Sequence, residues 1–273
     1  MYADDTVLFL SSESFVNIEK LLNSDLNNLF RWLSDNELAM NFKKGKTECT
    51  IFGTAKRIKS SDGTSLCVQV CGNNVTFSHT YKYLGVYLDK TLTMTQHFDE
   101  MYRRAAARVS LLQKIRPFID IYSAETIYKQ MVMPIVTYCS LALLGICQSK
   151  VVKMQKLETR SRQIIVNLRA IERSEIRLPT ISNTISKRAC SFVHDCINGN
   201  ANVIFDGLFE VVNHSIATRN NQFMIKLPKV KNEFGRKRMS YYAAFIYNKL
   251  PLNLRKIECQ SQFKKALDEY FCV

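Results

Sequence analysis

The sequence predicts an α+β fold in which short strands come first and helices follow. Strand-like apolar runs bounded by turn residues fall before residue 90, whereas apolar residues recurring every three or four positions dominate after it. The chain has 273 residues, of which 47% are hydrophobic, so it can bury one large core or two modest ones.

The first 53 residues are expected to run strand, helix, strand, turn, strand. An apolar run predicts a buried strand over residues 5–10, and Ser12 can cap the next helix, with Glu13 in its first turn. Apolar residues at helical spacing carry this helix to about residue 36: Phe15, Ile18, Leu22, Leu26, Leu29 and Leu33. Alternation over 38–42 and an apolar run over 47–52 predict two strands around a basic turn at 43–46.

A polar loop over 56–65 should lead into a small antiparallel sheet. Strand-like runs at 66–71 and 75–77 flank Gly72-Asn73-Asn74, which predicts a hairpin. A further strand is expected over 81–88, with Gly85 inside it. A glycine inside a strand often marks the close approach of another backbone.

Helices should follow to the end of the chain. The first has one apolar face (Phe98, Met101, Ala105, Val109 and Leu112) and a mostly basic opposite face. Ser123 is expected to cap a second helix that reaches about residue 133. Further helices are expected at 151–169, 186–197, 239–250 and around 263–271, with an irregular basic stretch at 199–238. The apolar run 131–147 contains Pro134 and falls short of the ~20 residues of a membrane span, so a buried helix and loop is expected.

Charge is distributed unevenly along the chain. The net charge is +14, yet residues 1–60 hold 8 basic and 8 acidic residues, so the excess lies behind them. This favours a polyanionic partner, most simply nucleic acid. No signal-peptide pattern begins the sequence, so we expect an intracellular protein, nuclear or cytoplasmic and not secreted, with reduced cysteines.

Asp4 and Asp5 are the strongest chemical signal. Adjacent carboxylates beside a strand repel each other unless a cation neutralises them, which invites a divalent metal. In two-metal phosphoryl transfer, carboxylates hold two Mg²⁺ ions about 3.5–4 Å apart. The dipeptide alone is more typical of an ordinary solvated pair, so its interpretation depends on the flanking sequence.

The flanking sequence resembles a known family. Tyr2-Ala3-Asp4-Asp5, the strand and long helix after it, and Lys46-Thr47 resemble the palm of reverse transcriptases. Lys82-Tyr83-Leu84-Gly85-Val86 looks like the primer grip and the start of the thumb in non-LTR retrotransposons. The helix with Arg103, Arg104 and Arg108 resembles the thumb, and Tyr247-Asn248-Lys249-Leu250-Pro251 is similar to the tail of such reading frames.

The resemblance implies a role for each matched residue. Asp4 and Asp5 would bind Mg²⁺ or Mn²⁺, and Tyr2, Tyr83, Leu84 and Gly85 would hold the primer end. Lys46 would approach the phosphates of the incoming dNTP, a role for which Lys43 and Lys44 compete. Apart from the resemblance, the cluster of Arg103, Arg104 and Arg108 itself suits RNA and DNA phosphates, and a solvated helix face is the alternative. No membrane partner is implied.

The same resemblance implies four segments. These are the C-terminal part of a palm (1–60), a small antiparallel, primer-grip-like sheet (61–90), a helical thumb-like region (91–183) and a helical basic C-terminal region (184–273). A complete palm also needs an upstream strand with its own Asp and the fingers, neither of which precedes Met1. We therefore expect a reverse-transcriptase fragment without polymerase activity of its own. A non-catalytic RNA- or DNA-binding module and a functionless retroelement remnant stay open as alternatives.

Cys190 and His194 stand four residues apart on one expected helix. Neither they nor the Cys67 and Cys71 pair match the spacing of a zinc finger. We therefore expect buried free thiols and a histidine that packs in the core or caps a helix.

Overall fold

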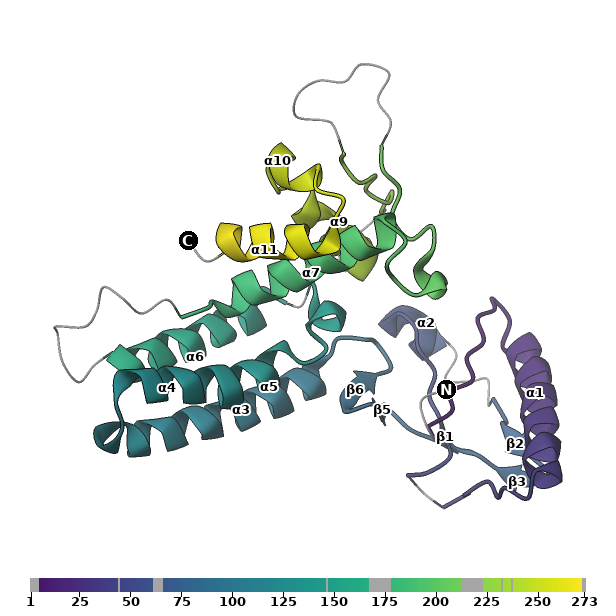
Figure 1. Ribbon diagram of the computed structural model, residues 1–273. Coiled ribbons are helices and arrows are strands. Elements are labelled where there is room, and N and C mark those ends of the chain that lie inside the picture. The colour runs from purple at the N-terminus through teal and green to yellow at the C-terminus, as the bar shows by residue number, and fades with distance from the viewer. Residues whose placement is uncertain are drawn as a thin grey trace. The chain divides into compact units, whose positions relative to one another are not determined.

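The computed structural model in Figure 1 describes residues 5–43, 45–60, 66–145, 147–166, 178–212, 223–231, 233–236 and 238–271. The chain divides into two compact units, Met1–His97 and Phe98–Val273. The first unit holds the named strands and the second is built from helices, which confirms the predicted α+β class.

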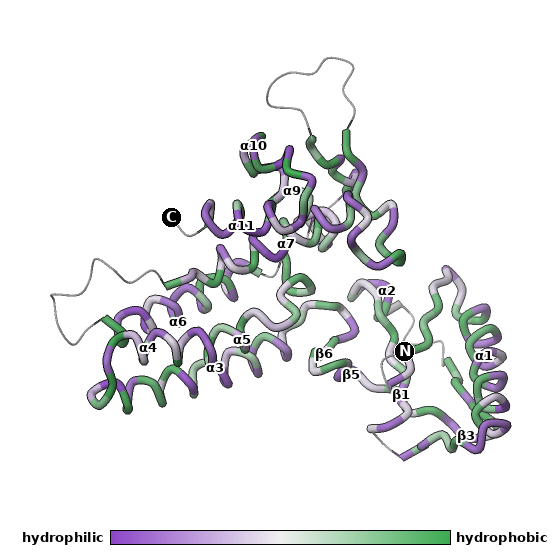
Figure 2. Tube along the Cα trace, viewed as in Figure 1, coloured by the Kyte–Doolittle hydropathy of each residue, from purple (hydrophilic) through white to green (hydrophobic). Residues whose placement is uncertain are grey.

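Helix α1 (Phe15–Asp35) is the main element of the first unit and confirms the predicted helix. Its apolar side packs Leu22, Leu26 and Phe30 against a small core of Val68, Val70 and Val75. The expected cap is wrong, because Ser14 is the N-cap residue and the Ser12 hydroxyl accepts a hydrogen bond from the Ser14 N–H. Figure 2 shows hydrophobic and hydrophilic residues alternating along α1, as an amphipathic surface helix requires.

Short two-stranded sheets make up the rest of the first unit. Strand β1 (Glu48–Cys49) pairs in parallel with β4 (Thr76–Phe77). Only these two residues of the strand expected at 47–52 are therefore confirmed as a strand. The strands expected over 5–10 and 38–42 are wrong: within these described residues only Asp5 takes part in a bridge, and Phe9 is 92% exposed. Strand-forming side chains make a strand only where a partner backbone satisfies the N–H and C=O groups.

Polar side chains of α1 follow the backbone of β2 (Gln69–Val70) at every second residue. The Cys67 N–H donates to Glu19, the Gln69 N–H to Asn23 and the Cys71 N–H to Asn27, at 3.0–3.1 Å. The Asn23 amide also donates to the Cys67 carbonyl at 3.0 Å. These side chains therefore satisfy an edge that would otherwise need another strand.

Two hairpins close through turns with left-handed residues. Strand β2 pairs with β3 (Asn73–Asn74) around Cys71 and Gly72, so the predicted hairpin is confirmed, although its turn starts one residue earlier. Strand β5 (Thr80–Tyr83) pairs with β6 (Val86–Asp89) around Leu84 and Gly85. The single strand expected over 81–88 is therefore wrong, and Gly85 serves a turn whose φ of +82° it supplies without strain.

A short helix, α2 (Ala55–Ser60), replaces the first part of the loop expected at 56–65. The Thr54 hydroxyl accepts a hydrogen bond from the Arg57 N–H at 3.3 Å, as a capping side chain does. Residues 61–65 lie outside the described part of the chain.

The second unit begins with a series of consecutive helical segments. Helix α3 (Thr95–Ile115) buries all five residues of its predicted apolar face. A short 3-10 turn, η1 (Arg116–Phe118), leads to α4 (Ile121–Ile127), a π-helical turn η2 (Tyr128–Val132) and α5 (Met133–Thr137). Asp120, not Ser123, is the cap of α4, because its carboxylate accepts the N–H and the hydroxyl of Ser123.

Helix α6 (Gln148–Val166) runs beside α3 in the same direction. Lys150 lies over the Phe98 ring near the start of both helices, and Arg160 donates to Gln113 further along. At the far end the buried Arg116 donates to the Ile165 carbonyl at 3.0 Å. The helix begins three residues before its predicted start, and its predicted end at 167–169 lies outside the described residues.

The C-terminal core surrounds helix α7 (Ile181–Ile197), which starts five residues before its prediction because Thr180 caps it. The turns η3 (Ser140–Leu143) and η5 (Val203–Phe205), helix α8 (Glu233–Arg236), helix α9 (Met239–Tyr247), helix α10 (Leu252–Arg255) and helix α11 (Gln260–Phe271) complete this part. Cys190, Tyr247 and Phe263 share one buried cluster. In the described part of the chain, no helix combines the length and apolar character of a membrane span.

Candidate nucleic-acid interface

Asp5 is the described member of the expected carboxylate pair, since Tyr2 and Asp4 lie outside the described residues. Its side chain is exposed. Burial, followed by the negative charges of Asp5 and Glu48, raises the pKa of the Tyr81 phenol. Asp5 and Glu48 therefore lie within electrostatic reach of the same ring. Glu48 was not predicted as a site residue from the sequence. The only indication of it there was its position in a predicted strand after the basic turn.

The described residues do not complete a metal site around Asp5. Nowhere among them do three His, Cys, Asp or Glu side chains gather closely enough to hold an ion. Glu48 is also engaged, because its carboxylate accepts the Gly45 N–H at 3.1 Å. The described donors thus fall short of the set that two catalytic cations need.

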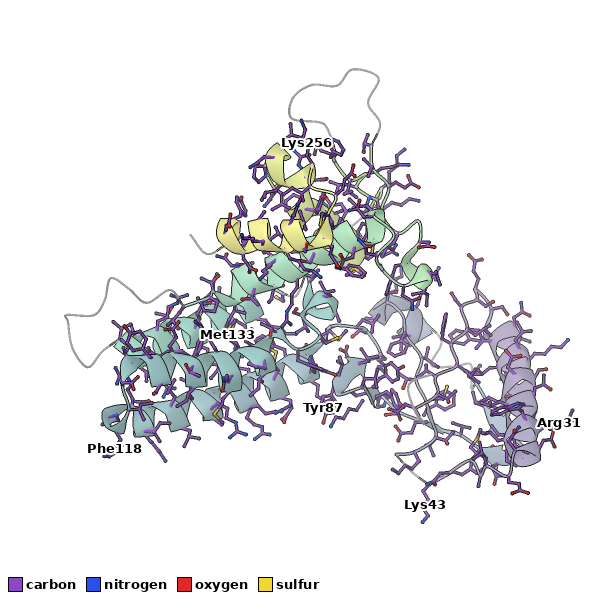
Figure 3. The ribbon with its side chains drawn as sticks, viewed as in Figure 1. Arg31, Lys43, Tyr87, Phe118, Met133 and Lys256 are labelled. Carbon is purple, nitrogen blue, oxygen red and sulfur yellow. The ribbon has the colours of Figure 1, made fainter. Side chains whose placement is uncertain are left out.

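The basic turn brings Lys43 and Lys46 together and leaves both exposed. The Lys46 N–H donates to the Lys43 carbonyl at 3.0 Å, and Gly45 takes a φ of +83° between them. In Figure 3 the Lys43 side chain points away from the ribbon. The backbone does not favour Lys46 over Lys43 for phosphate contact, and Lys44 lies outside the described residues.

Tyr83, Leu84 and Gly85 lie together at the end of the β5–β6 hairpin. Tyr83, the last residue of β5, pairs with Val86, the first residue of β6, and Leu84 is the exposed first turn residue with φ +45°. A left-handed conformation costs roughly 1–2 kcal/mol for a residue with a side chain. The two-residue turn requires this conformation, so it fixes the backbone of the hairpin tip where Tyr83, Leu84 and Gly85 lie.

Asp89 fixes the loop between this hairpin and α3. Its carboxylate accepts hydrogen bonds from the Thr91 and Thr93 hydroxyls and from the N–H groups of Thr93 and Met94, at 2.7–3.1 Å. Burial alone would raise the pKa of Asp89, but these hydrogen bonds outweigh it and lower the pKa. They also hold Leu92 and Met94 in left-handed conformations, with φ of 52° and 54°.

The three expected arginines of α3 are not equivalent. Arg103 forms a two-pronged ion pair with Glu100, at 2.8 and 3.0 Å, and this partner raises the pKa of the Arg103 guanidinium. Arg104 and Arg108 are exposed and, within the described residues, carry no ion pair. They lie one turn apart on the same side of α3, whereas Arg103 leaves about 100° away. Arg104 and Arg108 therefore form the better phosphate-facing pair.

Helix α6 adds positive charge beside α3. Lys153 and Lys156 are exposed on it, and Arg160 is tied to Gln113 of α3 at 2.9 Å. The sequence indicated these basic residues but not that α6 would lie alongside α3. Parallel neighbouring helices with cations on both can follow a phosphate backbone.

Cys190 and His194 form part of the core, as expected. Both are fully buried in α7, and the His194 ring stacks on Phe263 with centroids 4.0 Å apart. The His194 Nε2 atom lies 2.7 Å from the Ile257 carbonyl oxygen, so this nitrogen is engaged with backbone. Burial raises the pKa of the Cys190 thiol to about 12.

Distant homologues are polymerases of mobile elements. The chain is 27% identical over 202 residues to the RNA-directed DNA polymerase from mobile element jockey of Drosophila melanogaster, across 70% of this chain and 21% of that protein. It is 27% identical over 136 residues to the probable RNA-directed DNA polymerase from transposon X-element of the same species, across 46% of this chain and 15% of that protein. The jockey polymerase of Drosophila funebris is 28% identical over 136 residues, covering 49% of this chain and 14% of that protein.

These matches support the predicted resemblance to RNA-directed DNA polymerases. The matched region spans only about a fifth or less of each relative's length. No family model matches the sequence, and no solved structure matches the fold.

Proposed function

We propose that the chain is part of an RNA-directed DNA polymerase of a non-LTR retrotransposon and that it holds the primer–template duplex. The observation that carries the proposal is the similarity over 202 residues to the jockey polymerase. Residues 1–60 would belong to the end of the palm, 61–90 to a primer-grip-like sheet, 91–183 to the thumb and 184–273 to a basic C-terminal region.

Within this proposal, α3 contacts phosphates through Arg104 and Arg108. Their exposure and the net charge of +14 favour a polyanion. Tyr2, Tyr83, Leu84 and Gly85 would hold the primer end, where the strained Leu84 backbone fixes the hairpin tip. Lys46 would meet the incoming dNTP. RNA and DNA are the proposed partners, at a nuclear or cytoplasmic location.

Asp4 and Asp5 would belong to the Mg²⁺ or Mn²⁺ site of the parent enzyme, where the cations activate the primer 3′-hydroxyl and stabilise the leaving pyrophosphate. Two adjacent carboxylates do not hold two such cations by themselves. We therefore propose that these 273 residues bind nucleic acid but do not extend a primer alone. The non-catalytic binding module is the second candidate, and the exposed Arg104–Arg108 pair favours it equally.

Primer extension and binding by the purified chain test both proposals. We expect affinity for an RNA–DNA hybrid that falls steeply as KCl rises, because phosphate contacts release counterions. We expect no Mg²⁺-dependent extension of the primer strand. Affinity that does not depend on salt would contradict the binding proposal, and extension would contradict the proposed lack of activity.

A further inference from the structure

Helix α9 presents two aromatic rings to solvent between two cations. Its N-cap residue Arg238, then Tyr242, Phe245 and Lys249, follow one another at spacings of four, three and four residues. Tyr242 and Phe245 lie on the same side of α9, with Arg238 at its N-terminal end and Lys249 two residues beyond its C-terminal end. We call these four residues the α9 stripe.

The two rings lie outside the buried cluster of the second unit. Tyr242 is 36% and Phe245 38% exposed, whereas Ala243, Ala244 and Tyr247 fill the buried side of α9. The Tyr242 and Phe245 ring centroids lie 6.3 Å apart, and the Lys249 ammonium lies 4.3 Å from the Phe245 centroid. An aromatic pair and a cation thus share one continuous exposed surface.

The sequence on either side of the stripe is basic. Between Lys226 and Lys256 the sequence holds nine Lys or Arg residues and one acidic residue, Glu233. Asn248, next to Lys249, exchanges two hydrogen bonds of 2.8 Å with the backbone of Ile225. This clamp anchors the segment that carries the exposed Lys229 and Lys231 to the end of α9.

We propose that the α9 stripe binds single-stranded nucleic acid, with unpaired bases stacked on Tyr242 and Phe245 and phosphates paired with Arg238 and Lys249. The inference rests on the proposed function for the class of partner, and it adds a site separate from α3. Base–aromatic stacking is stronger than an exposed cation–π contact. An arriving base therefore displaces Lys249 from the Phe245 ring and leaves its ammonium to a phosphate.

Aromatic rings select single strands because the faces of duplex bases are already stacked on one another. A double helix offers this surface only its phosphates. The excess of basic residues favours nucleic acid over a protein partner, whose docking surface would have to be strongly acidic. The stripe would then hold RNA or DNA beyond the paired region.

Paired leucine substitutions test the stripe in the full 273-residue chain. Tyr242→Leu with Phe245→Leu keeps the apolar bulk but removes both ring faces. Phe118→Leu with Tyr122→Leu is the matched control, since these rings are 87% and 66% exposed around the turn between α3 and α4, where Figure 3 shows Phe118. The probes are labelled oligo-dT and oligo-U of about 12 nucleotides and an RNA–DNA hybrid of the same length.

We expect the Tyr242–Phe245 variant to bind the single strands roughly 30-fold more weakly, from two lost stacking contacts, and the hybrid within about twofold of the parent chain. The control should bind every probe as the parent chain does. Tighter binding of oligo-dT identifies the bound single strand as DNA, and tighter binding of oligo-U identifies it as RNA. Unchanged single-strand affinity, or an equal loss on hybrid and single strands, would overturn the inference and leave the surface to a protein partner.

Photocrosslinking of the unsubstituted chain gives a second measurement that does not depend on the variants folding. A bromouridine oligonucleotide should crosslink within the peptide that contains Tyr242 and Phe245, and crosslinks confined to other peptides would overturn the inference. The two proposals fail separately. If the parent chain binds the hybrid but not the single strands, the stripe proposal alone is rejected. If the parent chain binds neither probe, the proposed function is rejected as well.

Discussion

Replacing Asp89 with alanine should loosen the loop between the β5–β6 hairpin and α3. The carboxylate accepts four hydrogen bonds, two of them from backbone N–H groups. A hydrogen bond contributes about 0.5–1.5 kcal/mol net, and water replaces part of it because Asp89 is only partly buried. We therefore expect the first unit to lose about 2 kcal/mol of unfolding free energy.

Trp32 reports this change selectively. It is the only tryptophan in the chain and lies on α1, within the first unit. With a urea dependence of about 1–2 kcal/mol per molar, the fluorescence midpoint should fall by roughly 1–2 M. Asp25→Ala is the control, because Asp25 is exposed on the same unit and no hydrogen bond of its side chain is found among the described residues. Equal midpoints for the two variants would refute the role of Asp89.

The effect of Asp89 should also depend on pH. Because the folded-state pKa is lowered, the carboxylate stabilises the fold above the unfolded pKa of about 3.9, and this contribution disappears as pH falls through the folded pKa. The difference in unfolding free energy between the parent chain and Asp89→Ala should therefore be largest at neutral pH and should shrink in acid. A difference that stays constant from neutral pH into acid would contradict the charge-based explanation.

Three further substitutions test the hydrogen bonds between α1 and β2, the left-handed backbone of Leu84 and the buried hydroxyl of Tyr247. Asn23→Ala removes two hydrogen bonds between α1 and β2, so the Trp32 midpoint should fall by the equivalent of about 1–2 kcal/mol, and an unchanged midpoint would contradict the role of these side chains. Leu84→Gly relieves a left-handed leucine, so we expect about 1 kcal/mol more stability in the same urea titration, and a loss would show that Leu84 packs in the free protein. Tyr247→Phe removes a buried hydroxyl that has no partner among the described residues, so the thermal midpoint of the second unit should stay level or rise, and a clear fall would reveal a missed hydrogen bond.

The sequence predicts helices well here because each buries a periodic face. Phe98, Met101 and Ala105 lie on the expected side of α3, since this pattern depends only on neighbours along one helix. Helix starts were less predictable. Ser12 and Ser123 are good capping residues by type, yet Ser14 and Asp120 take those positions, because any nearby polar residue can compete for a cap.

Strands were predicted less well because they depend on partners far along the chain. Residues 5–10 have strand-like composition but, in the described part of the chain, no ladder beyond Asp5. The edge of β2 is instead satisfied by Glu19, Asn23 and Asn27, whose spacing along α1 gave no sign of that task. Such a helix, whose side chains bond the edge of β2 in place of a neighbouring strand, can be recognised only from the three-dimensional structure.

The sequence predicted which types of residue the candidate site contains, but not which of them interact with one another. Arg103, Arg104 and Arg108 are exposed as expected, yet Glu100 engages Arg103 and leaves the other two as the pair. The neighbourhood of Asp5, Glu48 and Tyr81 joins residues more than 30 positions apart. No local pattern encodes such a meeting.

The salt dependence of hybrid binding tests the central claim most directly. We expect Arg104→Ala with Arg108→Ala to flatten the slope of log affinity against log KCl by about 1.4–1.8, because two phosphate contacts are lost. Lys20→Ala with Arg31→Ala removes the same charge from the exposed side of α1 and should leave the slope almost unchanged. Equal slopes for the parent chain and the Arg104–Arg108 variant would contradict the account.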